Sequence, residues 1–235
     1  MSERHTRRKV LNRVSAMTIG GAALVGNTSA IEESDEGDNH RGFKELKKLF
    51  RDAAREDEEA GIDPNQMAVS DEQSELLKLS NGLSPSEKLT LAEEALTIKV
   101  EEPVASRSSP ASGYDFERER SIVGQYSAFE YSRTVWRYHL DVSWTRGGQN
   151  IVDLERRYYP HITTLGQSNG WEARDYELQD ESGGVGEMDY SAFVTAEFAM
   201  CVQGCINENH VWIDFDASAD GSTDTEYSHN DPIDT

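Results

Sequence analysis

Apolar side chains recur at helical spacing in the first third of the chain. Phe43, Leu46, Phe50 and Ala53 follow one another at intervals of three or four residues, with lysines and carboxylates between them. That spacing places the four side chains on one face of an amphipathic helix. The pattern predicts a helix that ends near Ala60, because glycine and proline follow.

Two capping signals predict further helices in the same region. Ser70 and Gln73 form a capping box, in which each side chain pairs with a backbone donor that the first helical turn leaves free. Ser84 and Glu87 repeat this pattern, and Pro85 takes the first helical position, where no donor is needed. We therefore expect three short helices.

The periodicity changes from helical to alternating in the second half of the chain. The clearest case is residues 136–145, whose alternate side chains are large and apolar: Trp136, Tyr138, Leu140, Val142 and Trp144. Because successive side chains of a strand point to opposite faces, this run predicts a half-buried strand. Similar runs predict strands at residues 121–131, 151–159, 171–178, 193–202 and 211–217. In the run 151–159 we expect Val152, Leu154 and Tyr158 to share a face.

These elements define an expected fold class and a set of boundaries. The fold is expected to be α+β, with short amino-terminal helices followed by an antiparallel all-β sandwich or barrel-like domain. The expected order is an acidic disordered leader at 31–42, a helical segment at 43–100, a Ser/Pro linker at 101–113, the β-sandwich domain at 114–218 and an acidic flexible tail at 219–235.

The net charge of the chain disfavours one class of partner and indicates the salt concentration in which the protein functions. The chain has 44 acidic and 23 basic residues, for a formal net charge of −21, which disfavours nucleic acid because phosphates would be repelled. All seven lysines precede residue 100. Concentrated salt screens the repulsion between surface carboxylates. In its excess of acidic residues and its avoidance of lysine, the chain resembles exported haloarchaeal proteins, which implies salt adaptation. The alternative is an acidic protein from a mesophile that lives at ordinary salt concentrations.

The amino terminus carries an export pattern. Arg7 and Arg8 follow a threonine and precede two apolar residues, a weakly apolar stretch comes next, and Ala30 ends a small-residue cleavage site. Residues 1–30 resemble a twin-arginine signal peptide. That resemblance implies the twin-arginine translocase and signal peptidase as partners during export, and a secreted or cell-surface location. The apolar stretch is too short for a permanent membrane span.

Cys201 and Cys205 are the only cysteines. In an exported chain, two cysteines at a tip between strands predict one disulfide. Zinc binding by the pair is disfavoured, because paired histidines are not found near it in the sequence.

Two weaker candidates for binding lie near the carboxy terminus. Oxygen-bearing side chains alternate before a glycine, as at the start of a calcium loop, although the acid expected at the loop's end is missing. The candidate ligands are Asp214, Asp216, Ser218, Asp220 and Asp224, and the alternative is a solvated acidic tail. Trp212 is a candidate for stacking on a ligand, or for packing beneath the helices. We expect no other cofactor.

No catalytic residues are assigned from the sequence. His139 is expected on the outer face of its strand beside Asp141, His161 in a turn and His210 at the start of the last strand, and nucleophile or phosphate-binding motifs are not found. We expect a non-catalytic exported protein that binds outside the cell or at its surface. The alternatives are a secreted antagonistic protein of the halocin or bacteriocin kind, with the helices as propeptide, and a less favoured secreted hydrolase.

Overall fold

The computed structural model describes most of the chain, namely residues 41–62, 74–101, 114–127, 132–202 and 204–229. The predicted signal peptide, nearly all of the acidic leader and almost the whole predicted linker lie outside the described residues. All described residues belong to one compact unit, His40–Asp231.

The described residues of this unit form four helices and eight strands. The helices are α1 (Phe43–Glu59), α2 (Glu75–Asn81), α3 (Pro85–Ala95) and α4 (Thr164–Ser168). The strands are β1 (Leu96–Glu101), β2 (Phe116–Tyr126), β3 (Arg133–Gly147), β4 (Asn150–Ile162), β5 (Trp171–Gly183), β6 (Asp189–Cys201), β7 (Cys205–Ser218) and β8 (Thr223–His229).

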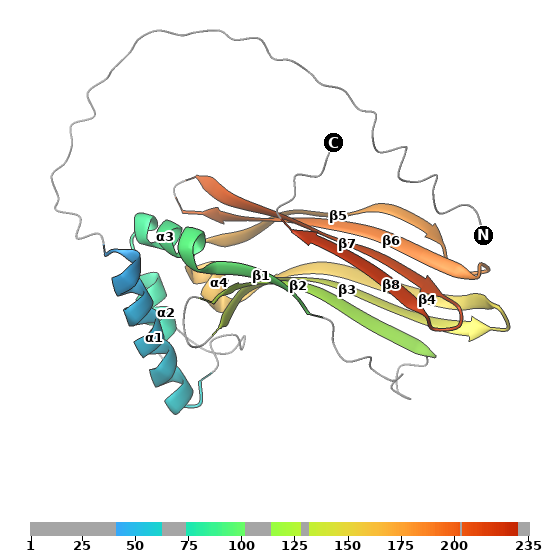
Figure 1. The fold of residues 1–235 in the computed structure, drawn as a ribbon, viewed down its shortest axis with the longest axis horizontal. Helices are drawn as coiled ribbons and strands as arrows, with labels where there is room; N and C mark the ends of the chain where they lie inside the picture. The colour runs from blue at the N-terminus through green and yellow to red at the C-terminus, as the bar shows by residue number, and fades with distance from the viewer. Residues whose placement is uncertain (1–40, 63–73, 102–113, 128–131, 203, 230–235) are drawn as a thin grey trace, which may run out of the picture. The chain divides into compact units, whose positions relative to one another are not determined.

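The strands form two open antiparallel sheets, each with its strands in sequence order. Sheet A contains β1-β2-β3-β4 and sheet B contains β5-β6-β7-β8, with α4 between them in the chain. Figure 1 shows the two sheets as stacked layers with the helices at one end. The expected antiparallel β-sandwich with a few helices is therefore confirmed at this level, whereas a closed barrel does not describe these open sheets.

Alternating apolar residues fill the space between the sheets. The five predicted inward residues of β3 are at most 1% exposed, which confirms the predicted face. The Trp136 ring stacks on Phe198 of sheet B with centroids 4.2 Å apart. The Tyr138 hydroxyl crosses the layer and donates to the Thr195 carbonyl at 2.9 Å. The interior is a packed core.

A bulge changes the expected face of β4. Trp144 pairs with Leu154 and Thr145 with Asp153, but Arg146 pairs with Ile151, so Val152 is the extra residue. Ile151 is fully buried and Val152 is 52% exposed. The prediction that Val152 shares a face with Leu154 was wrong, because a β-bulge shifts the alternation by one residue.

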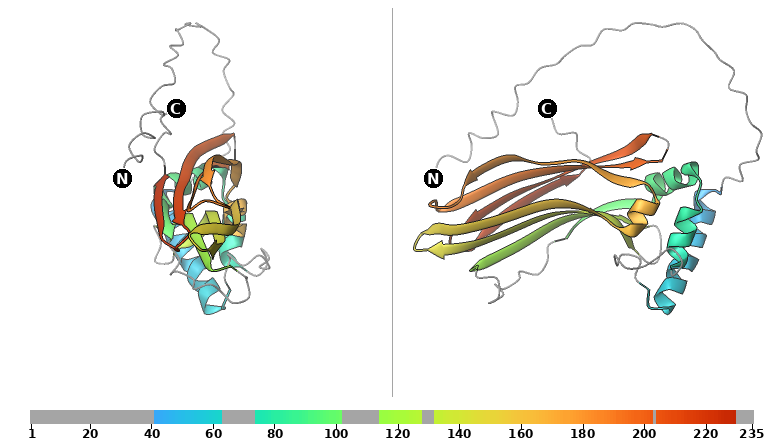
Figure 2. Two further views of the ribbon diagram at one scale, coloured as in Figure 1. Left: turned by 90° about the vertical axis from the view of Figure 1, so that its right-hand side faces the viewer. Right: turned by 180° about the vertical axis from the view of Figure 1, so that it is seen from behind.

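The amino-terminal helices share the core of the sandwich. Phe50 of α1 meets the Tyr126 ring of β2 edge-on at 6.3 Å, and Ser80 of α2 hydrogen-bonds Ser168 of α4 at 2.6 Å. Buried side chains of α1, α2 and α3 belong to the same contiguous apolar cluster as the two sheets. The rear view in Figure 2 shows α4 between these helices and the strands.

The start of α2 differs from the predicted capping box. Its N-cap is Ser74, whose hydroxyl accepts from the Leu77 amide at 3.1 Å. Ser70 and Gln73 lie outside the described residues. Asp57 of α1 reinforces this cap, because its carboxylate accepts from the Ser74 hydroxyl at 2.6 Å. A residue on another helix thus helps to set where α2 begins.

The capping box predicted at the start of α3 is confirmed. The Ser84 hydroxyl accepts from the Glu87 amide, and the Glu87 carboxylate accepts from the Ser84 amide at 2.8 Å. Glu87 also pairs with Arg41, whose Nε lies 2.5 Å from its Oε1. The hydrogen bond from Arg41, with those from Ser84, lowers the pKa of Glu87 to about 2 from its ordinary value of 4.5.

This depressed pKa predicts acid sensitivity. The carboxylate adds stability that is complete above pH 4.5 and is lost as the pH falls toward 2, by up to about 3 kcal/mol. The difference in unfolding free energy between the wild type and Glu87→Gln should therefore shrink over that range. Urea titrations at constant salt measure it, with exposed Glu93→Gln as control. An unchanged difference between pH 5 and 2.5, roughly the limits of the window, would contradict the prediction.

Two strands fall where the sequence suggested other structure. β1 lies at the end of the expected helical segment and pairs with β2, from Leu96 with Tyr126 to Glu101 with Ser121. β8 lies inside the expected flexible tail and pairs with β7. Both are edge strands, which gain backbone hydrogen bonds from one neighbour and so need little apolar sequence.

Candidate functional site

The outer face of sheet A carries a row of ionisable side chains brought together by strand register. On β3, His139 and Asp141 point to the face turned away from sheet B. Across the ladder, Ser121 pairs with His139 and Glu119 with Asp141 on β2, while Tyr159 of β4 pairs with His139. We call these five residues the His139 cluster.

Contacts within the His139 cluster are close. Nδ1 of His139 lies 3.3 Å from Oε1 of Glu119 and 3.2 Å from the Ser121 hydroxyl. The imidazole stacks on the Tyr159 ring with centroids 4.7 Å apart, and the Tyr159 hydroxyl donates to the Asp141 carboxylate. Although it lies on an outer face, His139 is only 9% exposed. Its neighbours, rather than a second layer, cover it.

This partial burial changes the acid-base properties of the cluster. Burial, helped by the nearby charge of Arg137, lowers the pKa of His139, although Glu119 opposes the shift. Burial and the negative charge of Glu119 raise the pKa of Asp141. Burial also raises the pKa of Tyr159. Perturbed groups gathered on one surface are typical of functional sites.

The basic residues beside the cluster have carboxylate partners of their own. Arg137 forms an ion pair with Glu101 at 3.0 Å, and Glu101 also pairs with Lys99 at 2.7 Å. Arg157 pairs with Glu155 on β4. Within the described ranges, neither Glu119 nor Asp141 forms an ion pair with a lysine or arginine.

The serine, histidine and acids do not form a hydrolytic triad. A triad needs the serine on one imidazole nitrogen and the acid on the other, so that the imidazole takes the serine's proton while the acid holds its tautomer and stabilises the imidazolium. Here the Ser121 hydroxyl and the Glu119 carboxylate both face Nδ1 of His139. Ser121 is also only 2% exposed, which shields its hydroxyl from a substrate. These contacts therefore lack the geometry of a Ser-His-acid triad.

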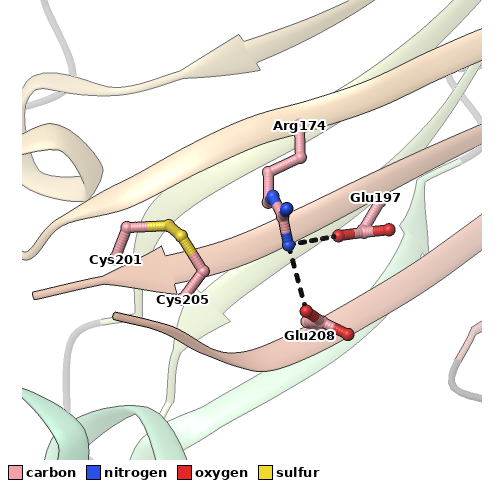
Figure 3. The surroundings of a disulfide bond; sticks show 5 residues. All are labelled: Arg174, Glu197, Cys201, Cys205 and Glu208. Atoms are coloured by element: carbon pink, nitrogen blue, oxygen red, sulfur yellow. Dashed lines mark hydrogen bonds and ion pairs between the residues drawn. A yellow bond between two sulfur atoms is a disulfide. The ribbon is translucent and has the colours of Figure 1, made fainter. Parts of the chain in front are cut away.

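The predicted disulfide is confirmed at the β6-β7 tip. Cys201 and Cys205 are bonded, with their Cα atoms 4.1 Å apart, and they are partners in the strand register. Figure 3 shows Arg174 beside this tip, where its guanidinium lies 3.3 Å from Glu197 and 3.1 Å from Glu208. This ion-pair network spans β5, β6 and β7. It and the disulfide hold the end of sheet B together.

The structure does not gather the five calcium candidates around one point. Asp214, Asp216 and Ser218 alternate along extended β7, which separates the first from the third by roughly 13 Å. Ligands of a single calcium ion lie only about 2.5 Å from it. Asp216 accepts from Ser191, while Asp220 accepts from Ser222 within the β7-β8 turn. Asp224 pairs in register with Asp216.

Trp212 lies half-buried on the outer face of sheet B. Its inward neighbours, Val211 and Ile213, are buried, as the alternation predicts. The indole packs against Phe193 of β6 with ring centroids 5.6 Å apart. Whether Trp212 stacks on a ligand stays a prediction, and it concerns a different face from that of the His139 cluster.

His161 and His210, the other two histidines considered from the sequence, lie outside the His139 cluster. His161 is part of β4, which continues to Ile162, so its placement in a turn was wrong. The reason is that Pro160 sits on an edge strand, where a missing backbone donor is tolerated. His210 lies within β7, 3.9 Å from Glu197.

Sequence reasoning found His139 and Asp141 as neighbours but missed the rest of the cluster. Glu119, Ser121 and Tyr159 come from other strands, and only the register shows that they meet.

In the described part of the chain, none of the helices is both long and apolar enough to cross a membrane. Comparison with protein-family models, curated proteins and solved structures finds no match to this chain.

Proposed function

We propose that this chain is an exported, salt-adapted, non-catalytic protein that binds at the cell exterior, and that the outer face of sheet A is its binding surface. The observation that carries the proposal is the His139 cluster. Two of its polar side chains, His139 and Ser121, are buried on a face that no other described element covers. Burying such groups lowers the stability of the fold, and proteins accept this cost mainly at functional sites. We propose that the function of this site is ligand binding.

The filled interior favours binding on the surface. Trp136, Trp144 and Trp171 are at most 2% exposed and occupy the space between the sheets. A ligand must therefore use an outer face, an edge or an end. Among these, the outer face of sheet A offers a partly exposed aromatic ring, Tyr159 at 41%, beside carboxylates and an imidazole. Aromatic rings with polar neighbours are typical of recognition sites.

The extracellular location is supported by the export pattern at Arg7 and Arg8 and by the disulfide. Disulfides persist mainly in oxidising compartments outside the cytoplasm. The excess of acidic residues supports the proposal that the protein functions in concentrated salt, because salt screens the repulsion between these charges. Under the antagonist alternative, the helices would be removed as a propeptide. It is less favoured because the helices share the sandwich core and β1, which precedes the linker, completes sheet A.

The test measures binding to cell envelopes. Mature protein is recovered from the producing cells and its intact mass is checked against residues 31–235 with one disulfide. It is then sedimented with isolated envelopes of those cells in concentrated salt. We expect wild type to bind, and Tyr159→Ala to bind at least about tenfold more weakly, which equals 1.4 kcal/mol.

The matched control is Tyr176→Ala. Tyr176 is 49% exposed and lies on β5, the edge strand of the other sheet. This variant should bind like the wild type. Wild type that stays in the supernatant, or equal loss of binding in both tyrosine variants, would refute the proposed surface. A mass that shows cleavage between residues 101 and 113 would favour the antagonist alternative instead.

A further inference from the structure

Carboxylate and imidazole atoms of the His139 cluster converge on one point. One ligand atom each from Glu119, His139 and Asp141 lies within 4.8 Å of the other two. The three residues come from adjacent positions of β2 and β3, where Glu119 faces Asp141 directly and His139 is two residues away on the same face. The strand ladder, rather than a flexible loop, fixes their spacing.

The spacing fits a metal ion. Two ligands about 2.0–2.1 Å from a tetrahedral ion lie about 3.3 Å from each other. Nδ1 of His139 and Oε1 of Glu119 are separated by 3.3 Å. A plain ion pair or hydrogen bond between these groups is usually shorter, near 2.8 Å. The separation of this pair is therefore compatible with an ion bound between the two atoms.

From this geometry we propose that Glu119, His139 and Asp141 bind one divalent transition-metal ion, of the zinc class, on the outer face of sheet A. The mixed set of imidazole and carboxylate favours such an ion over calcium or magnesium, which prefer oxygen ligands alone. Three protein ligands leave a coordination position open. The inference rests on the proposed function, because it names what the binding surface holds.

One neighbouring residue positions the ligands. The Tyr159 hydroxyl donates to Asp141 while its ring stacks on His139, so one side chain orients two ligands. Such outer contacts typically change metal affinity by 10–100-fold. The Ser121 hydroxyl lies 3.2 Å from the same nitrogen that faces Glu119, so its proton must turn away from that nitrogen when an ion binds there. A donor group of an extracellular partner can complete the coordination at the open position.

The second cluster of possible ligands in the described residues does not compete with this assignment. It consists of Glu172, Cys201 and Cys205. Both of its sulfur atoms are joined in the disulfide and are not available as thiolate ligands. The His139 cluster therefore remains the place where a site can form without breaking a covalent bond.

The test is calorimetric titration of chelator-treated mature protein with Zn²⁺. Concentrated sodium nitrate supplies the salt, because chloride itself complexes zinc. We expect one ion per chain, and an affinity reduced more than about tenfold in His139→Gln and in Asp141→Asn. Titration with Co²⁺ should give visible absorption bands of a nitrogen- and oxygen-ligated ion, which both variants lose.

The control for non-specific attraction to an acidic surface is Asp175→Asn. Asp175 is exposed on β5, and its replacement changes the net charge by the same amount as Asp141→Asn. It should bind Zn²⁺ like the wild type. Circular dichroism without metal checks that each variant is folded. If His139→Gln is unfolded, the comparison of Asp141→Asn with Asp175→Asn decides the matter. Equal binding in these two variants, or no binding by wild type, overturns the proposal.

Envelope sedimentation with and without chelator separates this inference from the proposed function. Wild type that binds envelopes but not Zn²⁺ refutes the metal site and leaves the binding surface standing. Wild type that binds one Zn²⁺ but no envelope refutes the surface-binding function and leaves the metal site standing. Binding of both, with envelope binding lost in chelator, supports both proposals together.

Discussion

Replacing Trp136 by alanine is expected to lower the free energy of unfolding by about 4 kcal/mol, because such substitutions of buried aromatic residues cost 3–5 kcal/mol. Trp136 is fully buried, stacks on Phe198 and meets Trp171 at 6.4 Å. Its ring also occupies the space over Gly124, where an added Cβ would lie only 2.1 Å from the indole. The cavity left by Trp136→Ala would therefore open at the contact between the two sheets.

Trp212→Ala is the matched control for this prediction. Trp212 is half-buried on the outer face and packs on one ring, Phe193. Its removal should cost about 1 kcal/mol, since outward residues lose less buried area. Urea unfolding followed by circular dichroism at constant salt measures both variants. If both tryptophans cost the same, the assignment of Trp136 to the inter-sheet core is wrong. If Trp136→Ala does not fold, the unfolding of Trp136→Phe is measured in its place.

Replacing Asp57 by alanine is expected to cost about 3 kcal/mol. The Asp57 carboxylate is 1% exposed and accepts from the Ser74 hydroxyl, from the Glu75 amide at 2.8 Å and from the Leu76 amide at 3.3 Å. The substitution leaves these donors buried without their acceptor, and hydrogen bonds to charged groups contribute about 1.5–3 kcal/mol. The start of α2 should loosen from α1.

Hydrogen exchange and urea unfolding together test this effect. The Glu75, Leu76 and Leu77 amides should exchange faster in Asp57→Ala, while amides of β3 lose only the protection that follows from the lower global stability. Glu58→Ala is the control, because Glu58 is exposed on the same helix near its carboxyl end. It should leave stability nearly unchanged. A similar loss in Glu58→Ala would show that the contacts of Asp57 are not responsible.

Candidate-site residues differ in how far the sequence revealed them. The alternation that places His139 and Asp141 on one face of β3 is local, so the sequence showed it. Glu119 and Tyr159 reach them only through the register of β2 and β4. In a chain with 44 acidic residues, any particular pair of carboxylates is uninformative until the register is known. The contribution of β2 and β4 to the cluster was therefore visible only in the structure.

Local signals accounted for most of the elements that were predicted well. The capping box of Ser84 and Glu87 set the start of α3, and the apolar spacing from Phe43 set α1. The pairing of Cys201 with Cys205 also followed from their proximity in the chain and the export pattern. In each case the deciding contacts lie within a few residues of each other, where pattern and propensity operate.

By itself the sequence determined that helices precede strands, the inward face of β3 and the disulfide, because short-range periodicity and spacing carry that information. Only the tertiary structure decided that polar β8 and short β1 become edge strands, that Val152 bulges outward and that Asp57 completes the start of α2. These features depend on backbone hydrogen bonds and side-chain contacts between distant segments. Such contacts stabilise conformations that the local sequence does not favour on its own.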